Sequence, residues 1–187
     1  LVIAIFSFSA EIDTTFLSYA EKAADSISNY RDKASILKLI AVEYAKSGQT
    51  QKALLIFDDA LNVAKFIYYN EDKAEALSKI ASELAKAGQT QQALQIFDKA
   101  LNVAGSISDD YFKAFTLSNI AVELAKAGQF DKAVTFAGSI SVDFLKLYAL
   151  SEIASALRDI ASELAKAGQF DKALTVAGSI SDDSDKA

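Results

Sequence analysis

The stretch IAVEYAKSGQ at residues 40–49 decides the fold, because it recurs as IASELAKAGQ at 80–89, IAVELAKAGQ at 120–129 and IASELAKAGQ at 160–169. Successive copies begin 40 residues apart. A fixed period of this length is the signature of a tandem-repeat protein, in which like supersecondary units stack on one another. The fold can therefore be worked out from one unit.

Each unit has the pattern of two amphipathic helices. Between Asp72 and Ala87 apolar residues recur every three or four positions, which is the spacing of one helical face. Gly88 then supplies a left-handed stop, and a second helix with a broad apolar surface starts near Thr90. Ser or Asp in the return segment 105–110 can cap the next helix. One pair cannot bury its apolar faces alone, so we predict an all-α solenoid of tandem antiparallel helix pairs.

Alanine recurs at two fixed places in the unit, where a side chain of one carbon lets two helices approach closely. The two sets are Ala41, Ala81, Ala121 and Ala161, and Ala53, Ala93, Ala133 and Ala173. We therefore expect these positions to lie at helix contacts.

The repeats predict a single domain over residues 1–187. The expected order is a partial repeat at about 1–32, repeats at about 33–71, 72–109, 110–142 and 143–181, and the start of a further repeat at 182–187.

One irregularity interrupts the period. The second helix after Gly128 is seven residues shorter than its counterparts, and the next first helix gains seven, from about Asp143 to Ala167. We expect this long helix to overhang its neighbour. The shift is either a neutral slippage that the stack absorbs or a docking surface for a second copy or a partner.

The unit resembles the tetratricopeptide repeat, whose outline has apolar residues and Gly in the first helix and Ala-x3-Phe in the second. The matching positions are Leu37, Ile40, Ala41, Tyr44, Gly48, Ala53, Phe57 and Ala60, and then Leu77, Ile80, Ala81, Leu84, Gly88, Ala93, Phe97 and Ala100. The departures are Leu in place of Trp, the longer unit and the absence of the closing Pro. HEAT-type arrays, which have a similar period, are the alternative family.

The resemblance implies a right-handed superhelix whose first helices line a concave groove that holds a peptide or partner helix. The most regular polar candidates for that groove are Lys46, Lys86, Lys126 and Lys166. They form either a basic ladder for an acidic or carboxyl-terminal segment, or cations that compensate helix dipoles and pair with Glu43, Glu83, Glu123 and Glu163. Further groove candidates are Lys38, Val42, Phe115, Val122 and Arg158, of which the apolar ones suit a helix or an extended apolar peptide.

Three aromatic residues, Phe66, Tyr68 and Tyr69, gather at the first return loop, where later units have Gly-Ser-Ile-Ser. They are either a contact site, since Tyr is favoured at interfaces, or a cap over the exposed edge of the core.

Composition narrows the classes of function. The chain has no His and no Cys, so the usual general base, a thiolate nucleophile and the commonest metal ligands are missing. We therefore predict a binding protein and no enzyme, with no cofactor and no metal site. The net charge of -6 and the absence of a basic stripe disfavour nucleic acid as a partner. The leading function is a protein–protein interaction scaffold, and the alternative is a self-associating module that forms homo-oligomers through uncapped repeat ends.

The apolar segment Leu1–Ala10 is too short to span a membrane. It is either the remnant of a secretory signal or the first helix of the stack. The second interpretation, together with the lack of Cys, suits a cytoplasmic protein, whereas the first makes the protein secreted or periplasmic.

Overall fold

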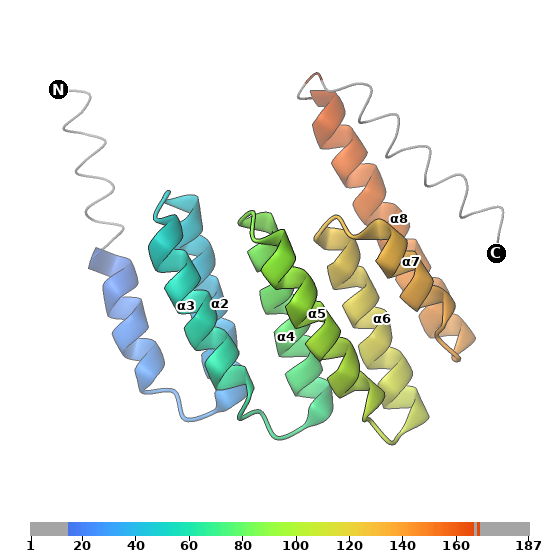
Figure 1. Cartoon of the computed structure of the whole chain (residues 1–187), viewed down its shortest axis with the longest axis horizontal. Coiled ribbons are helices and arrows are strands. Elements are labelled where there is room, and N and C mark those ends of the chain that lie inside the picture. Colours follow the sequence, from blue (N-terminus) through green and yellow to red (C-terminus); the bar gives the residue numbers. More distant parts are fainter. Residues whose placement is uncertain (1–14, 167, 169–187) are drawn as a thin grey trace. The chain divides into compact units, whose positions relative to one another are not determined.

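The computed structural model describes residues 15–166 and residue 168, with the backbone alone at 160 and at 163–166. Every regular element among these residues is an α-helix, which confirms the predicted all-α class. The chain divides into two compact units between Ile107 and Ser108. Figure 1 labels the helices in chain order. The segment Leu1–Ala10 and the predicted repeat start at 182–187 lie outside the described residues.

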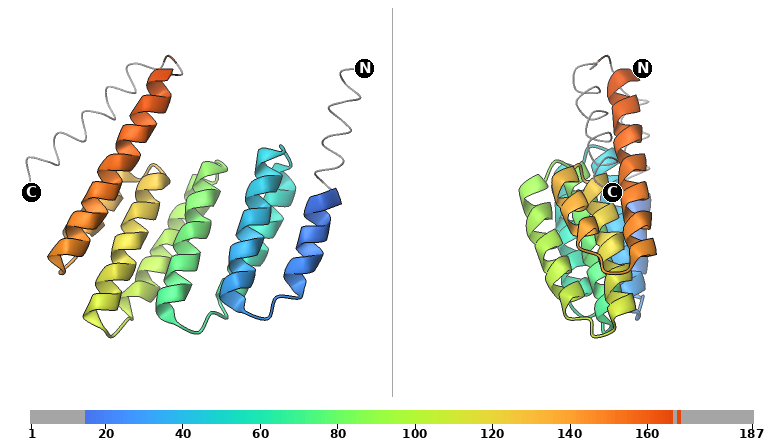
Figure 2. Two further views of the ribbon diagram at one scale, coloured as in Figure 1. Left: turned by 180° about the vertical axis from the view of Figure 1, so that it is seen from behind. Right: turned by 90° about the vertical axis from the view of Figure 1, so that its right-hand side faces the viewer.

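Unit 1 contains two antiparallel helix pairs. Helix α2 (Tyr30–Lys46) pairs with α3 (Thr50–Ala64), and α4 (Asn70–Lys86) pairs with α5 (Thr90–Gly105). Helix α4 also packs against both α2 and α3, and a helical segment at residues 15–25 precedes α2. Seen from behind, the first helices α2 (blue) and α4 (green) lie side by side in one layer (Figure 2).

The core of unit 1 repeats from one pair to the next. Phe57 in α3 and Phe97 in α5 are buried, and each lies four residues after a buried alanine, Ala53 or Ala93. Ala41 and Ala81 are fully buried on the first helices. Their burial agrees with the predicted placement of alanine at helix contacts, since a larger side chain at a buried position would overpack the core.

Glycine ends each first helix. Gly88 has a φ of +84°, and the N–H of Gln89 donates to the carbonyl of Leu84 at 2.9 Å while the N–H of Gly88 donates to that of Ala85. This pair of bonds is the Schellman arrangement, which satisfies carbonyls that a helix end leaves without partners. Gly48, Gly128 and Gly168 share the positive φ, so the repeat stops each first helix in the same way.

Side-chain caps start two of the first helices. Asn29 accepts hydrogen bonds from the N–H groups of Arg31 and Asp32 at the start of α2. Asp109 accepts one from the N–H of Phe112 at the start of the first helix of unit 2. Both satisfy N–H groups that have no partner within the helix.

A partly buried polar contact joins the helical segment 15–25 to the first pair. The Tyr44 hydroxyl donates to the Glu21 carboxylate, and Lys52 Nζ donates to the other oxygen of that carboxylate at 2.9 Å. Burial, followed by the hydrogen bond and charge of Glu21, raises the pKa of Tyr44 to about 12. The neutral phenol is therefore the form that the folded chain stabilises.

Unit 2 contains α6 (Asp110–Lys126), α7 (Phe130–Gly138) and α8 (Asp143–Lys166), each of which packs against the other two. Helix α7 has nine residues, whereas the equivalent helix α5 has 16. Helix α8 has 24, which is about 36 Å at 1.5 Å per residue. The predicted transfer of seven residues from one helix to the next is therefore confirmed.

Candidate functional site

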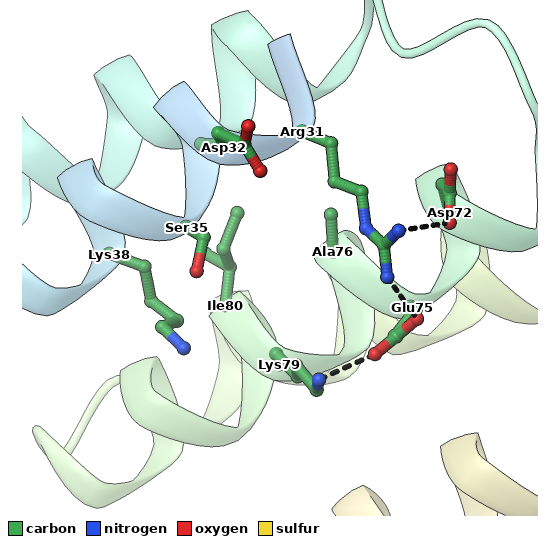
Figure 3. Close-up of a pocket in the computed structure, with 10 residues that line it drawn as sticks. Arg31, Asp32, Ser35, Lys38, Asp72, Glu75, Ala76, Lys79 and Ile80 are labelled. Atoms are coloured by element: carbon green, nitrogen blue, oxygen red, sulfur yellow. Dashed lines mark hydrogen bonds and ion pairs between the residues drawn. The ribbon is translucent and has the colours of Figure 1, made fainter. Parts of the chain in front are cut away.

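A cleft of about 270 Å³ lies between the first helices α2 and α4 of unit 1 (Figure 3). Three basic and three acidic side chains line it, together with small and apolar ones. The lining residues are Arg31, Asp32, Ala34, Ser35 and Lys38 from α2, and Asp72, Glu75, Ala76, Lys79 and Ile80 from α4. A segment bound here would therefore meet charges of both signs on a floor of small residues.

Ion pairs cross this cleft and run along one side of it. Arg31 reaches from α2 to Asp72 at 3.2 Å and to Glu75 at 3.5 Å, and Lys79 pairs with Glu75 from the next turn of α4 (Figure 3). The Arg31 side chain is 54% exposed, so water screens these pairs. Exposed pairs contribute about 0–1 kcal/mol each. A partner could exchange them for its own charges at small cost.

The first helices of unit 2 carry aromatic residues at the positions where those of unit 1 carry polar ones. Counted from each helix start, the second residue is Arg31, Glu71, Tyr111 and Phe144 in α2, α4, α6 and α8, and the sixth is Ser35, Glu75, Phe115 and Tyr148. The rings of Tyr111 and Phe144 lie 6.2 Å apart, and the aromatic residues at these two positions, Tyr111, Phe115, Phe144 and Tyr148, are all exposed. The first-helix surface is thus charged in one unit and aromatic in the other.

Comparison with known families agrees with this repeat architecture. Residues 72–138 match the family model described as tetratricopeptide repeat. The matched stretch begins in α4 and ends with α7, so it contains helices from both units. The chain is therefore similar to the tetratricopeptide repeat, as the positions of Leu, Ala, Gly and Phe predict.

Among solved structures, the chain is similar to the crystal structure of Ton1535 from Thermococcus onnurineus NA1, with a TM-score of 0.64 and 21% sequence identity. The similarity covers 95% of this chain and 57% of that one, so this chain spans a little over half the length of its structural relative. At this identity the likeness concerns the fold. No curated protein matches the sequence.

The repeated lysines of these tetratricopeptide-like units lie in the last turns of the first helices. Lys46, Lys86 and Lys126 each donate to the glutamate three residues earlier, at 2.7, 2.7 and 2.9 Å. The hydrogen bond and charge of Glu43 raise the pKa of Lys46. This is the pairing that one of the two sequence hypotheses expects, and none of the three residues lines the α2–α4 cleft. The Lys166 side chain lies outside the described residues.

The other groove candidates fall in different environments. Lys38 lines the α2–α4 cleft, whereas Val42 on the same helix is half-buried. Phe115 is exposed, but Val122 is buried. Arg158 is exposed and donates to the Ser155 hydroxyl within α8. The structure therefore brings Lys38 together with Arg31 and Lys79, which the sequence did not single out.

The aromatic loop between α3 and α4 stands on a buried isoleucine. Phe66, Tyr68 and Tyr69 are 65%, 87% and 63% exposed, whereas Ile67 is 4% exposed. Ile107 in unit 1 and Ile140 in unit 2 are buried in the corresponding loops. Isoleucine closes the core at these loops, so the three aromatic rings remain available at the surface.

The described residues contain no cluster of three or more Asp or Glu side chains arranged to hold a metal ion. None of the described helices combines the length and apolarity needed to cross a membrane.

Proposed function

We propose that this chain is a protein–protein interaction scaffold that holds a peptide or partner helix on the first-helix surface of unit 1. Tetratricopeptide repeats generally mediate protein–protein interaction, and the chain resembles them over α4 to α7. The observation that carries the proposal is the open cleft between α2 and α4, with six charged side chains around a floor of Ala34, Ala76 and Ile80. It suits a segment that carries charges of both signs.

The charges of the cleft favour recognition over tight binding. Each exposed ion pair contributes little by itself, but a complementary arrangement of charges rejects partners that place like charges together. Arg31 offers a planar guanidinium that binds a carboxylate through two N–H groups. Lys38 on α2 and Lys79 on α4 line the cleft from its two sides, with Lys79 turned toward Glu75 of its own helix (Figure 3). We therefore infer a partner segment with at least one carboxylate facing these three cations.

The chain contains a matched pair of charge changes that tests this assignment. Peptides selected from a random display library on the immobilised chain would serve as probes, and their affinity would be measured by isothermal titration calorimetry. Lys38→Glu with Lys79→Glu alters the cleft, whereas Lys46→Glu with Lys86→Glu makes the same change in net charge at the last turns of the same two helices. Helicity by circular dichroism would confirm that both variants fold.

We expect the cleft variant to lose roughly tenfold or more in affinity and the control to lose less than about threefold, since each 1.4 kcal/mol is a factor of ten. Equal affinity for the cleft variant and wild type would remove the α2–α4 cleft from consideration. A loss confined to the Lys46 and Lys86 variant would place binding on the lysine ladder.

We infer that the chain acts by binding and not by catalysis. The tetratricopeptide repeat family is generally non-catalytic, and this sequence contains neither His nor Cys to act as base or nucleophile.

A further inference from the structure

The helix positions that line the α2–α4 cleft carry a different chemistry in unit 2. They are the second, third, fifth, sixth and ninth positions of the earlier first helix, and the third, sixth, seventh, tenth and eleventh of the later one. In α2 and α4, charged residues hold three of the first five and three of the second five. In α6 and α8, Glu152 alone among them is charged, and four are aromatic, namely Tyr111, Phe112, Phe115 and Tyr148.

Two observations indicate that α8 meets α6 in the same register as α4 meets α2. The rings of Tyr111 and Phe144, each at the second position of its helix, lie 6.2 Å apart. Ala149 and Ile153 are buried, and they hold the seventh and eleventh positions of α8, which are positions that α4 turns toward α2. The sixth position of α6 and the sixth and tenth of α8 therefore share one surface, as their equivalents do in unit 1.

The residues at these three positions are Phe115, Tyr148 and Glu152, which we call the aromatic site. Phe115 is 44% exposed although α8 packs against its helix, and Tyr148 is 46% exposed, so exposure belongs to this position of a first helix. Glu152 is half-buried and has no ion pair or hydrogen-bonding partner for its side chain among the described residues. Two open rings thus lie on the same surface as a carboxylate whose charge no neighbour compensates.

Such a site has the electrostatic character of a cation site. The face of an aromatic ring is negative and attracts a cation, and a carboxylate beside it adds to that attraction. The chain itself contains this combination, since Lys52 Nζ lies 5.7 Å from the centroid of the Tyr44 ring and 2.9 Å from the Glu21 carboxylate. Arginine suits two rings and a carboxylate better than lysine does, because its planar guanidinium stacks on a ring and donates two N–H groups to a carboxylate.

We propose that unit 2 binds a partner protein segment through an arginine, whose guanidinium stacks on Phe115 and Tyr148 and pairs with Glu152. Charge complementarity selects this occupant, since the surface offers aromatic rings and a single negative charge. The site is additional to the α2–α4 cleft and shares no residue with it. It rests on the proposed role of the chain as a scaffold, and it adds a second recognition surface with a different preference.

The first stage of the test selects peptides that depend on the two rings. A random display library would be bound to the immobilised wild-type chain, after removal of peptides that bind the double variant Phe115→Ser with Tyr148→Ser. The matched control is Phe66→Ser with Tyr68→Ser, which removes two exposed aromatic rings from unit 1. All four changes affect exposed residues, and circular dichroism would confirm that both variants are folded. The selected peptides should bind the control variant as well as wild type.

The second stage measures the affinity of the selected peptides by isothermal titration calorimetry. Glu152→Gln removes the carboxylate, and Asp159→Asn makes the same charge change at an exposed position farther along α8. We expect the peptides to contain an arginine, and Glu152→Gln to weaken binding roughly tenfold while Asp159→Asn weakens it less than about twofold. Citrulline, an uncharged analogue, in place of that arginine should cause a similar loss. The two losses should not add, because both changes remove one interaction.

Three results would overturn the proposal. The first is that no selected peptide depends on the two rings, and the second is that the dependent peptides lack arginine. The third is equal affinity of Glu152→Gln and wild type. Concentration-dependent growth in mass that Phe115→Ser with Tyr148→Ser abolishes would also overturn it, since a second copy would then be the occupant. None of these variants alters the α2–α4 cleft, so failure here leaves the test of that cleft unaffected.

Discussion

Gly88 is predicted to be required for its backbone conformation alone. Its φ of +84° lies in the left-handed region, and a Cβ placed there meets no atom within 4 Å. Replacement by alanine therefore adds no clash with a neighbour and adds only the left-handed penalty, which is about 1–2 kcal/mol. The smaller entropy of the unfolded alanine chain offsets part of that cost. The expected net loss in the free energy of unfolding is about 1 kcal/mol.

Replacing Gly105, in the same unit, by alanine should change the free energy of unfolding in the opposite direction. It is the last residue of α5, has no positive φ and also leaves free space for a Cβ. Alanine is favoured over glycine in a helix by up to about 1 kcal/mol, and by less at the last position, so Gly105→Ala should stabilise by about 0.5 kcal/mol. The two variants should then differ by about 1.5 kcal/mol.

The assay is urea unfolding followed by circular dichroism at 222 nm, the usual helical signal. With a slope of about 1–3 kcal/mol per molar urea, the two midpoints should differ by roughly 1 M, with Gly88→Ala the lower. Gly88→Asn should fall between Gly88→Ala and wild type, since Asn tolerates the left-handed region. Shifts of equal sign and size for the two alanine variants would contradict the backbone argument.

Three further perturbations test the packing and the partly buried polar contact of Tyr44. Ala93 on α5 is 1% exposed, so Ala93→Leu adds three carbons to a buried position and should cost about 1–3 kcal/mol of stability. Ala23→Leu at an exposed position should change stability by less than about 0.5 kcal/mol. Urea unfolding measures both changes. Ile67→Ala should cost about 2–4 kcal/mol and Tyr68→Ser next to it almost nothing, and equal costs would mean that the aromatic ring closes the core. The neutral Tyr44 phenol, with its pKa raised to about 12, contributes stability that is complete below pH 10 and is lost as pH rises from 10 through 12. The difference in unfolding free energy between wild type and Tyr44→Phe should therefore fall by roughly 2 kcal/mol over that interval, and a constant difference would contradict it.

The repeat allowed much of the fold to be predicted from local rules. Gly88 and its equivalents, the buried alanines and the seven-residue transfer into α8 all follow from spacing along one helix. The predicted first helix from Asp72 begins two residues earlier, at Asn70. Helix ends depend on capping contacts, which spacing alone does not fix.

The candidate site was less predictable because it depends on which helix faces meet. Arg31 pairs with Asp72 and Glu75, and nothing in the 40-residue period places Arg31 opposite those two. The lysines of the last turns were conspicuous because they repeat, but a repeated Lys after Glu is also what a helix end favours. The repeated sequence matches Ile160 with Ile120 of the unit before. Matching the helix starts instead pairs Asp143 of α8 with Asp110 of α6. Counting from Asp143 places Phe144 and Tyr148 at the positions that Arg31 and Ser35 hold in α2.

The most direct test of the scaffold proposal is amide chemical-shift mapping on the nitrogen-15-labelled chain, titrated with a peptide selected by display. We predict that the perturbed amides cluster at Ser35 and Lys38 of α2 and at Ala76 and Lys79 of α4, around the cleft. Perturbations centred on the exposed residues of α3 and α5, such as Leu55 and Gln95, or on the loop at Tyr68, would contradict it.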